Sequence, residues 1–512
     1  MAGIGFELKK LFHRRGLMAM LRAYGYAGVI CAGPMLLGVL LQFGVLIVSG
    51  WWQVGRPDRD LLVCMITYTL LASLVLTSFL SMPVTRFLAD MLFDHDEKMI
   101  LPSFWGSTGI MLVVGAVLYT VFLLFSGATL MQGVLCLWLF LEMVVNWNAM
   151  SYLTAIKDYK SILYSFAAAV LVAFITSCVL LALALPPVES LLFAVVLGYG
   201  VMLVWDVLLL HRYFPQSREN PWLFLQWVDQ FLPLALTGLF TTIGLFAHLV
   251  ITWCGPLGIK VKGLFYGAPY YDVPAMLAFL TILITTVNFV VSVEVNFYPT
   301  YRSYYSLLNT VKDITVAENE MLAVLNRELH YTALKQLLVT AAVISLEKTV
   351  LNALPLGFND AMHGYFRVLC VGYALYAVGN IVMLILLYFT DYYGALTASA
   401  LFAGSTVIFA VIGQFFTTTL FGFGFLVGAS LFAIYAMFRL ASYTDNLPYR
   451  VLGQQPIVAQ RKRGRFTELG ILLEHGEQRI DQSLHHTEHK RHARRECGTN
   501  ITEANNAIGE ES

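Results

Sequence analysis

The chain has 512 residues, of which 58% are hydrophobic and only 12% are charged, and its mean hydropathy is +0.71. Soluble domains contain about a quarter charged residues, so this composition excludes a water-soluble protein and indicates a membrane protein. The formal net charge is zero, which gives no sign of a nucleic-acid partner.

The N-terminus combines a short basic stretch with a long apolar run. Residues 27–50 contain no charged side chain, and about 20 such residues cross the hydrocarbon core of a bilayer. A cleaved signal peptide has an apolar core of only about 7–15 residues, so we interpret 27–50 as an uncleaved span. Residues 1–26 are expected to form an interfacial amphipathic helix, because Ile4, Leu8 and Phe12 share one face.

Eleven further apolar runs follow the first span, and each is about as long as a membrane-crossing helix. A transmembrane barrel is excluded, because its strands would alternate in polarity over about ten residues. The predicted fold class is therefore an all-α integral membrane protein with about twelve transmembrane helices. The further runs cover residues 61–82, 104–126, 129–153, 162–185, 189–211, 230–254, 273–297, 336–356, 368–390, 395–417 and 420–438.

Lys and Arg residues in the connections predict the orientation, because they are enriched on the cytoplasmic side. They gather before the first span and in the connections on that same side, which places both termini in the cytoplasm. These residues include Lys9, Lys10, Arg14, Arg15, Arg22, Arg86, Lys98, Lys157, Lys160, Arg212, Arg218, Arg302, Lys312, Arg327 and Lys335.

The helices divide into two expected lobes of six, residues 27–215 and residues 216–440. A proline and an arginine three apart recur at corresponding positions, in "SMPVTRFLAD" and "NFYPTYRSYY", as parallel repeats would give. Residues 298–335 are expected to form a cytoplasmic loop with a surface helix. Residues 441–512 are polar and poor in aromatic side chains, and we expect a disordered cytoplasmic tail.

Polar side chains at helical spacing mark three of the spans. Polar groups inside a membrane must be paired or face a cavity, so these faces predict either a hydrated path for a sugar or hydrogen bonds between helices. The first stripe consists of Thr237, Thr241, His248 and Thr252, the second of Thr281, Thr285, Asn288 and Ser292, and the third of Thr69, Ser73, Thr77 and Ser81.

Four carboxylates lie within spans or at their edges: Glu142, Asp206, Asp229 and Glu294. A charge at the centre of a transmembrane helix costs at least ~2.5–3.5 kcal/mol. Glu142 lies mid-span with Asn146 one turn further on, so we predict that it couples transport to a proton or cation. The other three lie nearer the cytoplasmic face, where a structural role competes with a functional one.

The motifs expected of an enzyme are missing from the sequence. It has no G-x-x-x-x-G-K-[ST] run and no zinc-ligand pattern, so we expect neither ATP hydrolysis by a P-loop nor a metal or cofactor. Gly33 and Pro34 interrupt the first span. A proline in a transmembrane helix frees a backbone carbonyl, and this position is a candidate gate or a static kink.

The opening "MAGIGFELKKLF", the twelve-span plan and "DHDEKMILPSFWG" after the second span resemble the PelG family of exopolysaccharide exporters. The resemblance runs from residue 1 to about residue 450. It implies the polysaccharide-transporter branch of the MOP flippase superfamily, with two six-helix lobes, alternating access and an inner-membrane location. It also implies a cargo rich in N-acetylhexosamine, a cytoplasmic PelF-like glycosyltransferase, and PelD- and PelE-like membrane partners.

Several functions remain open at this point. The first is an exopolysaccharide exporter, and the second is a cation-coupled small-molecule antiporter or a lipid-linked oligosaccharide flippase of the same fold. A membrane-embedded transferase is a third, with His248 and His363 as the histidines near spans. The connections and tail are too short for a nucleotide-sugar transferase domain, which needs well over 100 residues, so we expect a transporter and not an enzyme.

The orientation can be tested by cysteine labelling in a cysteine-free variant. A cysteine at position 262 is expected to react with a membrane-impermeant maleimide from outside the cytoplasmic membrane, and one at position 312 is not. The opposite pattern would reverse the predicted orientation.

Overall fold

The computed structural model describes residues 41, 44–45, 47–153, 159–307, 314–353, 357–416, 421–453 and 463–476. Within them, eleven helices are long and apolar enough to cross a membrane, and they correspond in order to the second through twelfth predicted spans. The first span lies mostly outside the described residues, although residues 47–51 are helical. The predicted interfacial helix at 1–26 lies entirely outside them.

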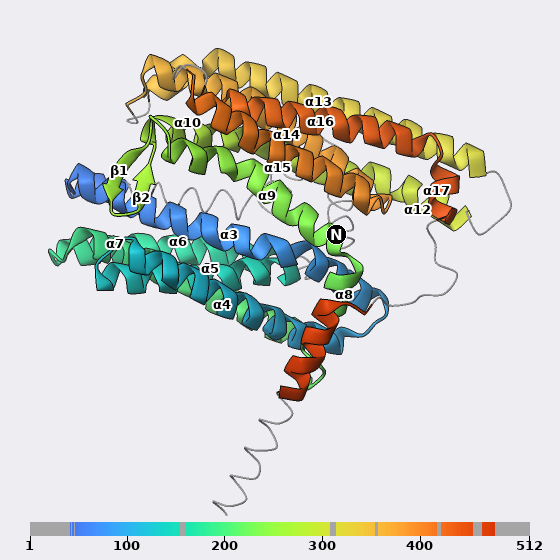
Figure 1. Cartoon of the computed structure of the whole chain (residues 1–512), viewed down its shortest axis with the longest axis horizontal. Coiled ribbons are helices and arrows are strands. Elements are labelled where there is room, and N and C mark those ends of the chain that lie inside the picture. Colours follow the sequence, from blue (N-terminus) through green and yellow to red (C-terminus); the bar gives the residue numbers. More distant parts are fainter. Residues whose placement is uncertain are drawn as a thin grey trace, which may run out of the picture.

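The first half of the chain forms one helical bundle, seen in Figure 1 as the blue-to-teal helices. Its helices share a continuous buried core of aliphatic and aromatic side chains, and we call it lobe 1. It consists of α3 (Arg56–Phe93), the short η1 (Glu97–Met99), α4 (Ile100–Phe125), α5 (Leu130–Leu153), α6 (Tyr159–Ala182), α7 (Pro187–Tyr213) and α8 (Leu225–Gln230).

The second half forms a separate bundle with its own buried core, drawn in green to orange in Figure 1, and we call it lobe 2. Prolines at the first turns of α9 and α10 suit helix starts, where the missing N–H costs nothing. The lobe consists of α9 (Leu232–Trp253), the hairpin β1 (Ile259–Lys262) and β2 (Phe265–Gly267), α10 (Pro269–Phe279), η2 (Leu280–Ile282), α11 (Leu283–Ser292), the π-helix η3 (Val293–Phe297), α12 (Tyr298–Leu307), α13 (Ile314–Ala353), α14 (Asp360–Tyr388), α15 (Tyr392–Gln414), α16 (Phe423–Thr444) and α17 (Leu447–Gly453).

The polar segments are more helical than expected. Residues 298–335 were expected as a loop with a surface helix, but α12 and α13 occupy most of that range, and α13 runs on without a break into the ninth span. In the tail expected to be disordered, residues 447–453 and 465–476 are helical.

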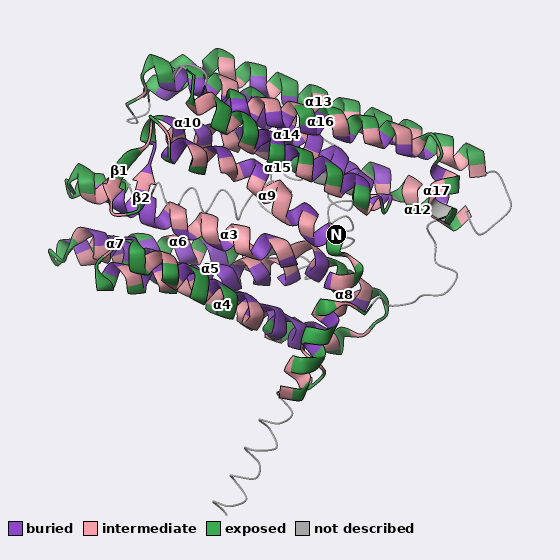
Figure 2. Cartoon of the chain, viewed as in Figure 1, coloured by how far each residue is buried: buried purple, intermediate pink, exposed green. Residues whose placement is uncertain are grey.

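Many residues on the outer faces of the helices are exposed, as Figure 2 shows for both bundles, and many of them have large apolar side chains. On α4, for example, Val113, Val117 and Leu118 are all more than half exposed. So many exposed apolar side chains would be unfavourable in water, but they suit helices whose outer faces contact lipid.

The two lobes contact each other along α3 and α9. A Cβ atom on Gly238 of α9 would lie 2.5 Å from the backbone carbonyl oxygen of Ser78 on α3, so only glycine allows the two helices to approach this closely. This contact lies in the half of the molecule that contains α8, which we call the α8 end.

The β1–β2 hairpin bridges the lobes at the opposite end, the hairpin end. The Tyr68 hydroxyl of α3 donates to the Tyr266 carbonyl oxygen at 3.0 Å and accepts from the Tyr266 N–H at 3.2 Å. The Tyr68 ring stacks on Trp253 with a centroid distance of 4.7 Å. Lys262 Nζ also donates to Gln132 Oε1 of lobe 1 at 3.0 Å, so lobe 2 reaches lobe 1 at both ends.

The glycine contact predicts the effect of adding one methyl group. We expect Gly238→Ala to lower the apparent melting temperature in detergent, because overpacking costs about 1–3 kcal/mol. Gly109→Ala is the matched control, since its Cβ would meet no atom within 4 Å and alanine favours a helix by about 0.5–1 kcal/mol. Equal melting temperatures for the two variants would contradict the close contact between α3 and α9.

Candidate functional site

A ladder of polar side chains joins α11 to α13 inside lobe 2. Ser292 Oγ donates to Glu328 Oε2 at 2.6 Å, and Asn288 Nδ2 donates to Thr332 Oγ1 at 3.0 Å. The Thr285 hydroxyl donates to Gln336 Oε1. These hydrogen bonds satisfy most of the polar groups of the second predicted stripe, and Thr281 of η2 donates to the Ala278 carbonyl oxygen of α10.

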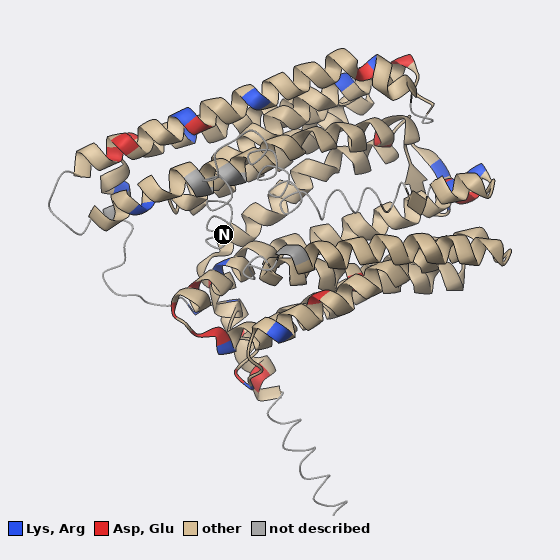
Figure 3. Ribbon diagram, turned by 180° about the vertical axis from the view of Figure 1, so that it is seen from behind, with Lys and Arg blue, Asp and Glu red and all other residues tan. Residues whose placement is uncertain are grey.

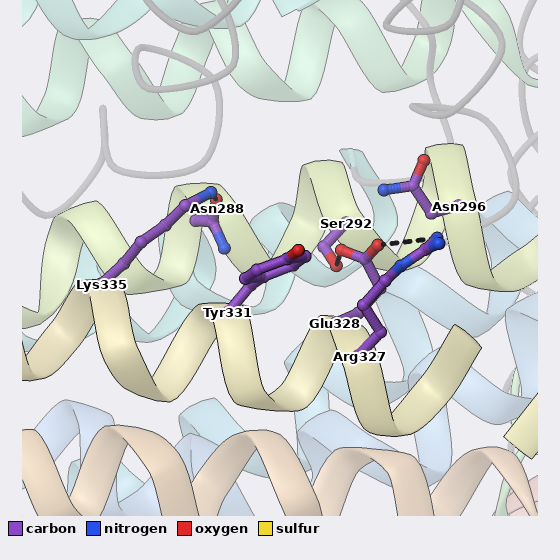
Figure 4. A pocket seen from close by; sticks show the side chains of 7 residues that line it. All are labelled: Asn288, Ser292, Asn296, Arg327, Glu328, Tyr331 and Lys335. Carbon is purple, nitrogen blue, oxygen red and sulfur yellow. Dashed lines mark hydrogen bonds and ion pairs between the residues drawn. The ribbon is translucent and has the colours of Figure 1, made fainter. Parts of the chain in front are cut away.

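The ladder widens into a pocket of about 340 Å³. Lys335 Nζ donates to Asn288 Oδ1 at 2.5 Å, and Arg327 forms an ion pair of 3.4 Å with Glu328. In Figure 4 the side chains of α13 and those of the facing helix point toward one another across the pocket. The full lining consists of Asn288, Ser292, Asn296, Arg327, Glu328, Tyr331 and Lys335.

The wall of the pocket is irregular where α11 ends. Residues 293–297 form the π-helix η3 before α12 begins, and Asn296 of this turn lines the pocket. A π-turn inserts an extra residue into the helical repeat, and such turns are often found at functional sites. The backbone of Glu294 belongs to η3.

Lobe 1 contains two buried carboxylates. Glu142 on α5 is 8% exposed, and Asp206 on α7 is fully buried. Within the described part of the chain, Glu142 Oε2 and both carboxylate oxygens of Asp206 have no hydrogen-bond partner. Asn146 Nδ2, one turn from Glu142, donates to the Tyr199 carbonyl oxygen of α7 at 3.3 Å. Buried carboxylates without partners are candidates for binding a proton or a cation.

Glu142 lies against a glycine of the neighbouring helix. A Cβ atom on Gly200 of α7 would be 3.1 Å from Glu142 Oε1. The glycine therefore leaves room beside the carboxylate that a larger side chain would fill.

The stripe on α9 faces the interior of lobe 2. Thr237, Thr241 and Thr252 each donate to a carbonyl oxygen one turn earlier in α9. His248 Nδ1 lies 2.8 Å from the Tyr271 hydroxyl, and its Nε2 lies 3.4 Å from the Tyr373 hydroxyl. The His248 contacts match the interhelical alternative, whereas the three threonines bond within their own helix. The role of this stripe in transport stays a prediction.

The other predicted residues have separate positions. Gly33 and Pro34 lie outside the described residues. Asp229 of α8 accepts hydrogen bonds from a segment of the C-terminal tail. His363 Nε2 lies 3.1 Å from Asn352 Oδ1, and its Nδ1 lies 3.7 Å from Glu347.

Sequence reasoning missed the half of the site that α13 contributes, because the span was expected to begin at residue 336. The sequence did contain a signal for the contribution of α13. Four polar residues recur at intervals of four, which places them on one face of a helix: Glu328, Thr332, Gln336 and Thr340. This line matches the stripe on the preceding span and could have indicated the pairing.

The match to known families covers most of the chain. Residues 1–452 match the model of the PelG family, described as "Putative exopolysaccharide Exporter (EPS-E)". The chain belongs to the PelG family. Among curated proteins the comparison finds no match. The family description connects the chain with exopolysaccharide export.

Solved structures with a similar fold are transporters of the MOP superfamily. An outward-facing multidrug resistance MATE transporter matches with a TM-score of 0.56 and 15% identity, over 84% of this chain and 97% of that one. Its inward-facing conformation matches with a TM-score of 0.55 and 15% identity, over 79% and 95%. A MOP transporter from Pyrococcus furiosus matches with a TM-score of 0.56 and 16% identity, over 82% of this chain and 96% of that one. The chain thus has the MOP fold.

Glu142 provides a test of coupling in lobe 1. We expect Glu142→Gln to insert at normal abundance but to reduce export to near background, because the amide keeps the shape and loses the charge. Glu142→Asp should keep part of the activity. The measurement is secreted polymer relative to protein abundance.

The matched control is Glu189→Gln on α7, a carboxylate at the hairpin end that accepts from Gln132 Nε2 at 2.8 Å. This variant should export normally. Full export by Glu142→Gln at normal abundance would rule out a coupling role for Glu142.

Proposed function

We propose that the protein exports an exopolysaccharide across the bacterial inner membrane, and that the pocket between α11 and α13 contacts the sugar units. The polar pocket inside a two-lobe MOP fold is the observation on which this proposal depends. Membership of an exopolysaccharide exporter family supports the cargo class.

The lining of the pocket suits a carbohydrate. It offers hydroxyl, amide, ammonium, guanidinium and carboxylate groups, which together supply the donors and acceptors that sugar hydroxyls need. Tyr331 adds an aromatic ring that is half exposed. The volume of about 340 Å³ lies at the lower end of the range for ligand pockets, about 300–1,000 Å³, so the pocket would hold a single unit of a longer polymer.

The proposed orientation places the α8 end in the cytoplasm. Figure 3 shows charged residues mainly toward the ends of the helices and along α13. Arg86, Lys98, Arg212, Arg218 and Arg450 lie toward the α8 end, whereas Arg56, Arg59, Lys260 and Lys262 lie toward the hairpin end. This distribution agrees with the enrichment of Lys and Arg on the cytoplasmic side.

Transport would proceed by alternating access between the two lobes. Each lobe has its own core, so each can move as a unit while the contacts between them change. The contact between Gly238 and Ser78 would separate when the α8 end opens to the cytoplasm. The Tyr68 contacts with Tyr266 and Trp253 would separate when the hairpin end opens.

A separate enzyme would make the polymer. The segments between the spans are short, and a nucleotide-sugar transferase domain needs well over 100 residues. The cytoplasmic glycosyltransferase and the two membrane partners implied by the resemblance fit this division of labour. An N-acetylhexosamine-rich cargo is part of the same proposal.

A cation-coupled antiporter is the second candidate. The observation that favours it is the presence of two buried carboxylates, Glu142 and Asp206, with unpaired oxygens in the described part of lobe 1. Uptake of a cationic dye into vesicles driven by an ion gradient would support this function over polymer export.

A deletion strain tests the export proposal. Loss of the protein is expected to abolish secreted polymer and leave polymer inside the cell, and the wild-type gene should restore secretion.

The variant Lys335→Gln tests the pocket, because it removes the charged group that donates a hydrogen bond to Asn288. Hydrogen bonds to charged groups contribute about 1.5–3 kcal/mol, so secretion should fall about tenfold or more.

The control is Lys348→Gln, an exposed lysine on the same helix outside the pocket, which should secrete normally. Unchanged secretion in the deletion strain would refute the export function. Equal secretion by the two lysine variants would refute the role of the pocket.

A further inference from the structure

A segment of the C-terminal tail lies on the opposite lobe from the one it follows. Residues 463–476, which we call the strap, come after α17 in lobe 2 and lie beside α8 and lobe 1 in Figure 1. The strap is helical from residue 465 to residue 476. It lies beyond residues 1–452, which match the PelG family, so the family resemblance accounts for no part of it.

Asp229 of α8 binds the start of the strap helix. Its carboxylate accepts hydrogen bonds from the Phe466 N–H at 3.3 Å, the Thr467 N–H at 2.6 Å and the Thr467 hydroxyl at 2.6 Å. The first N–H groups of a helix have no partner within it, and a carboxylate at this position is favoured by the helix dipole. Asp229 thus caps the strap from another part of the chain.

The fit around this carboxylate is close. A Cβ atom on Gly464 would lie 2.5 Å from Asp229 Oδ1, so glycine is required for the approach. Thr467 is 4% exposed, which protects its hydrogen bonds from water. These features indicate a specific docking site and not a chance surface contact.

Further contacts extend along the strap, and all of them reach lobe 1. The Phe466 ring lies 6.1 Å from the Phe79 ring of α3, measured between centroids. Asn220 Nδ2 donates to Glu474 Oε2 at 2.7 Å. Phe466 and Leu473 pack against the core of lobe 1.

The chain before the strap is anchored in lobe 2. Leu447 of α17 is fully buried in the core of that lobe. Ten peptide steps lead from Gly453 to Arg463, and a fully extended chain of that length spans at most about 35 Å. While the strap is docked, Arg463 therefore stays within about 35 Å of Gly453, which sets an upper bound on the separation of the lobes at the α8 end.

We propose that the strap is a latch between the lobes, which keeps the α8 end closed while it is docked and must leave Asp229 before that end opens. The inference rests on the proposed transport cycle, because only a cycle requires this end to open. The latch belongs to this chain itself and needs no other protein.

A cysteine at position 78 measures the opening of the α8 end. Ser78 is 8% exposed and lies at the contact between the lobes, so Ser78→Cys in an otherwise cysteine-free chain should react slowly with a membrane-permeant maleimide. Removing residues 463–512, or changing Asp229→Asn, should raise the labelling rate, by about tenfold for the loss of one charge-assisted hydrogen bond.

A reversible cross-link tests the need for release. In the cysteine-free chain that carries Ser78→Cys, Asp229→Cys and Thr467→Cys should form a disulfide upon oxidation. Labelling at position 78 and polymer export should then stop, and a reductant should restore both. An Asn148→Cys and Ser107→Cys pair, which joins α5 to α4 within lobe 1, is the control and should leave both unchanged.

The outcomes separate the two proposals. If labelling at position 78 is the same with the strap cross-linked, free or deleted, the latch is refuted whatever the cargo. If labelling responds as expected but no variant, including the wild type, exports polysaccharide, the latch stands and the proposed function fails. Export that continues at the full rate with the strap cross-linked also refutes the latch.

Discussion

Polar groups inside a lipid-embedded bundle must find partners within the protein, and much of this structure follows from that constraint. The backbone meets it by forming helices across the membrane. Short hydroxyl side chains such as those of Thr77 and Thr237 meet it by donating to a carbonyl oxygen one turn earlier. Longer side chains need a second helix, as in the ladder between α11 and α13. The pocket lies where that ladder widens.

Both lobes pair polar side chains between helices. In lobe 2, His248 lies between two tyrosine hydroxyls, and in lobe 1, Asn148 donates to Ser107 and Thr108 of the neighbouring helix. Lobe 1 keeps Glu142 and Asp206 buried with unpaired oxygens in the described part of the chain. The chemistry of the protein is therefore divided, with candidate ligand contacts in one lobe and candidate coupling groups in the other.

The two lobes contact each other along α3 and α9 and through the hairpin. At the hairpin end, aromatic stacking of Tyr68 on Trp253 joins hydrogen bonds to Tyr266. At the α8 end, a close helix contact at Gly238 lies near the docked strap. In the proposed transport cycle, the contacts at one end would separate while those at the other end remain.

The sequence by itself determined the class of the molecule, because runs of about 20 apolar residues have no stable alternative to membrane-spanning helices. It also indicated the polar stripe on η2 and α11, since the spacing of Thr281, Thr285, Asn288 and Ser292 places them on one helical face. Only the tertiary structure decided what those residues meet. Glu328 and Lys335 lie more than 30 positions away, and periodicity along one helix contains no information about its neighbour. Asp229 is the clearest case, because its partners lie 237 and 238 residues along the chain, where only folding could bring them together.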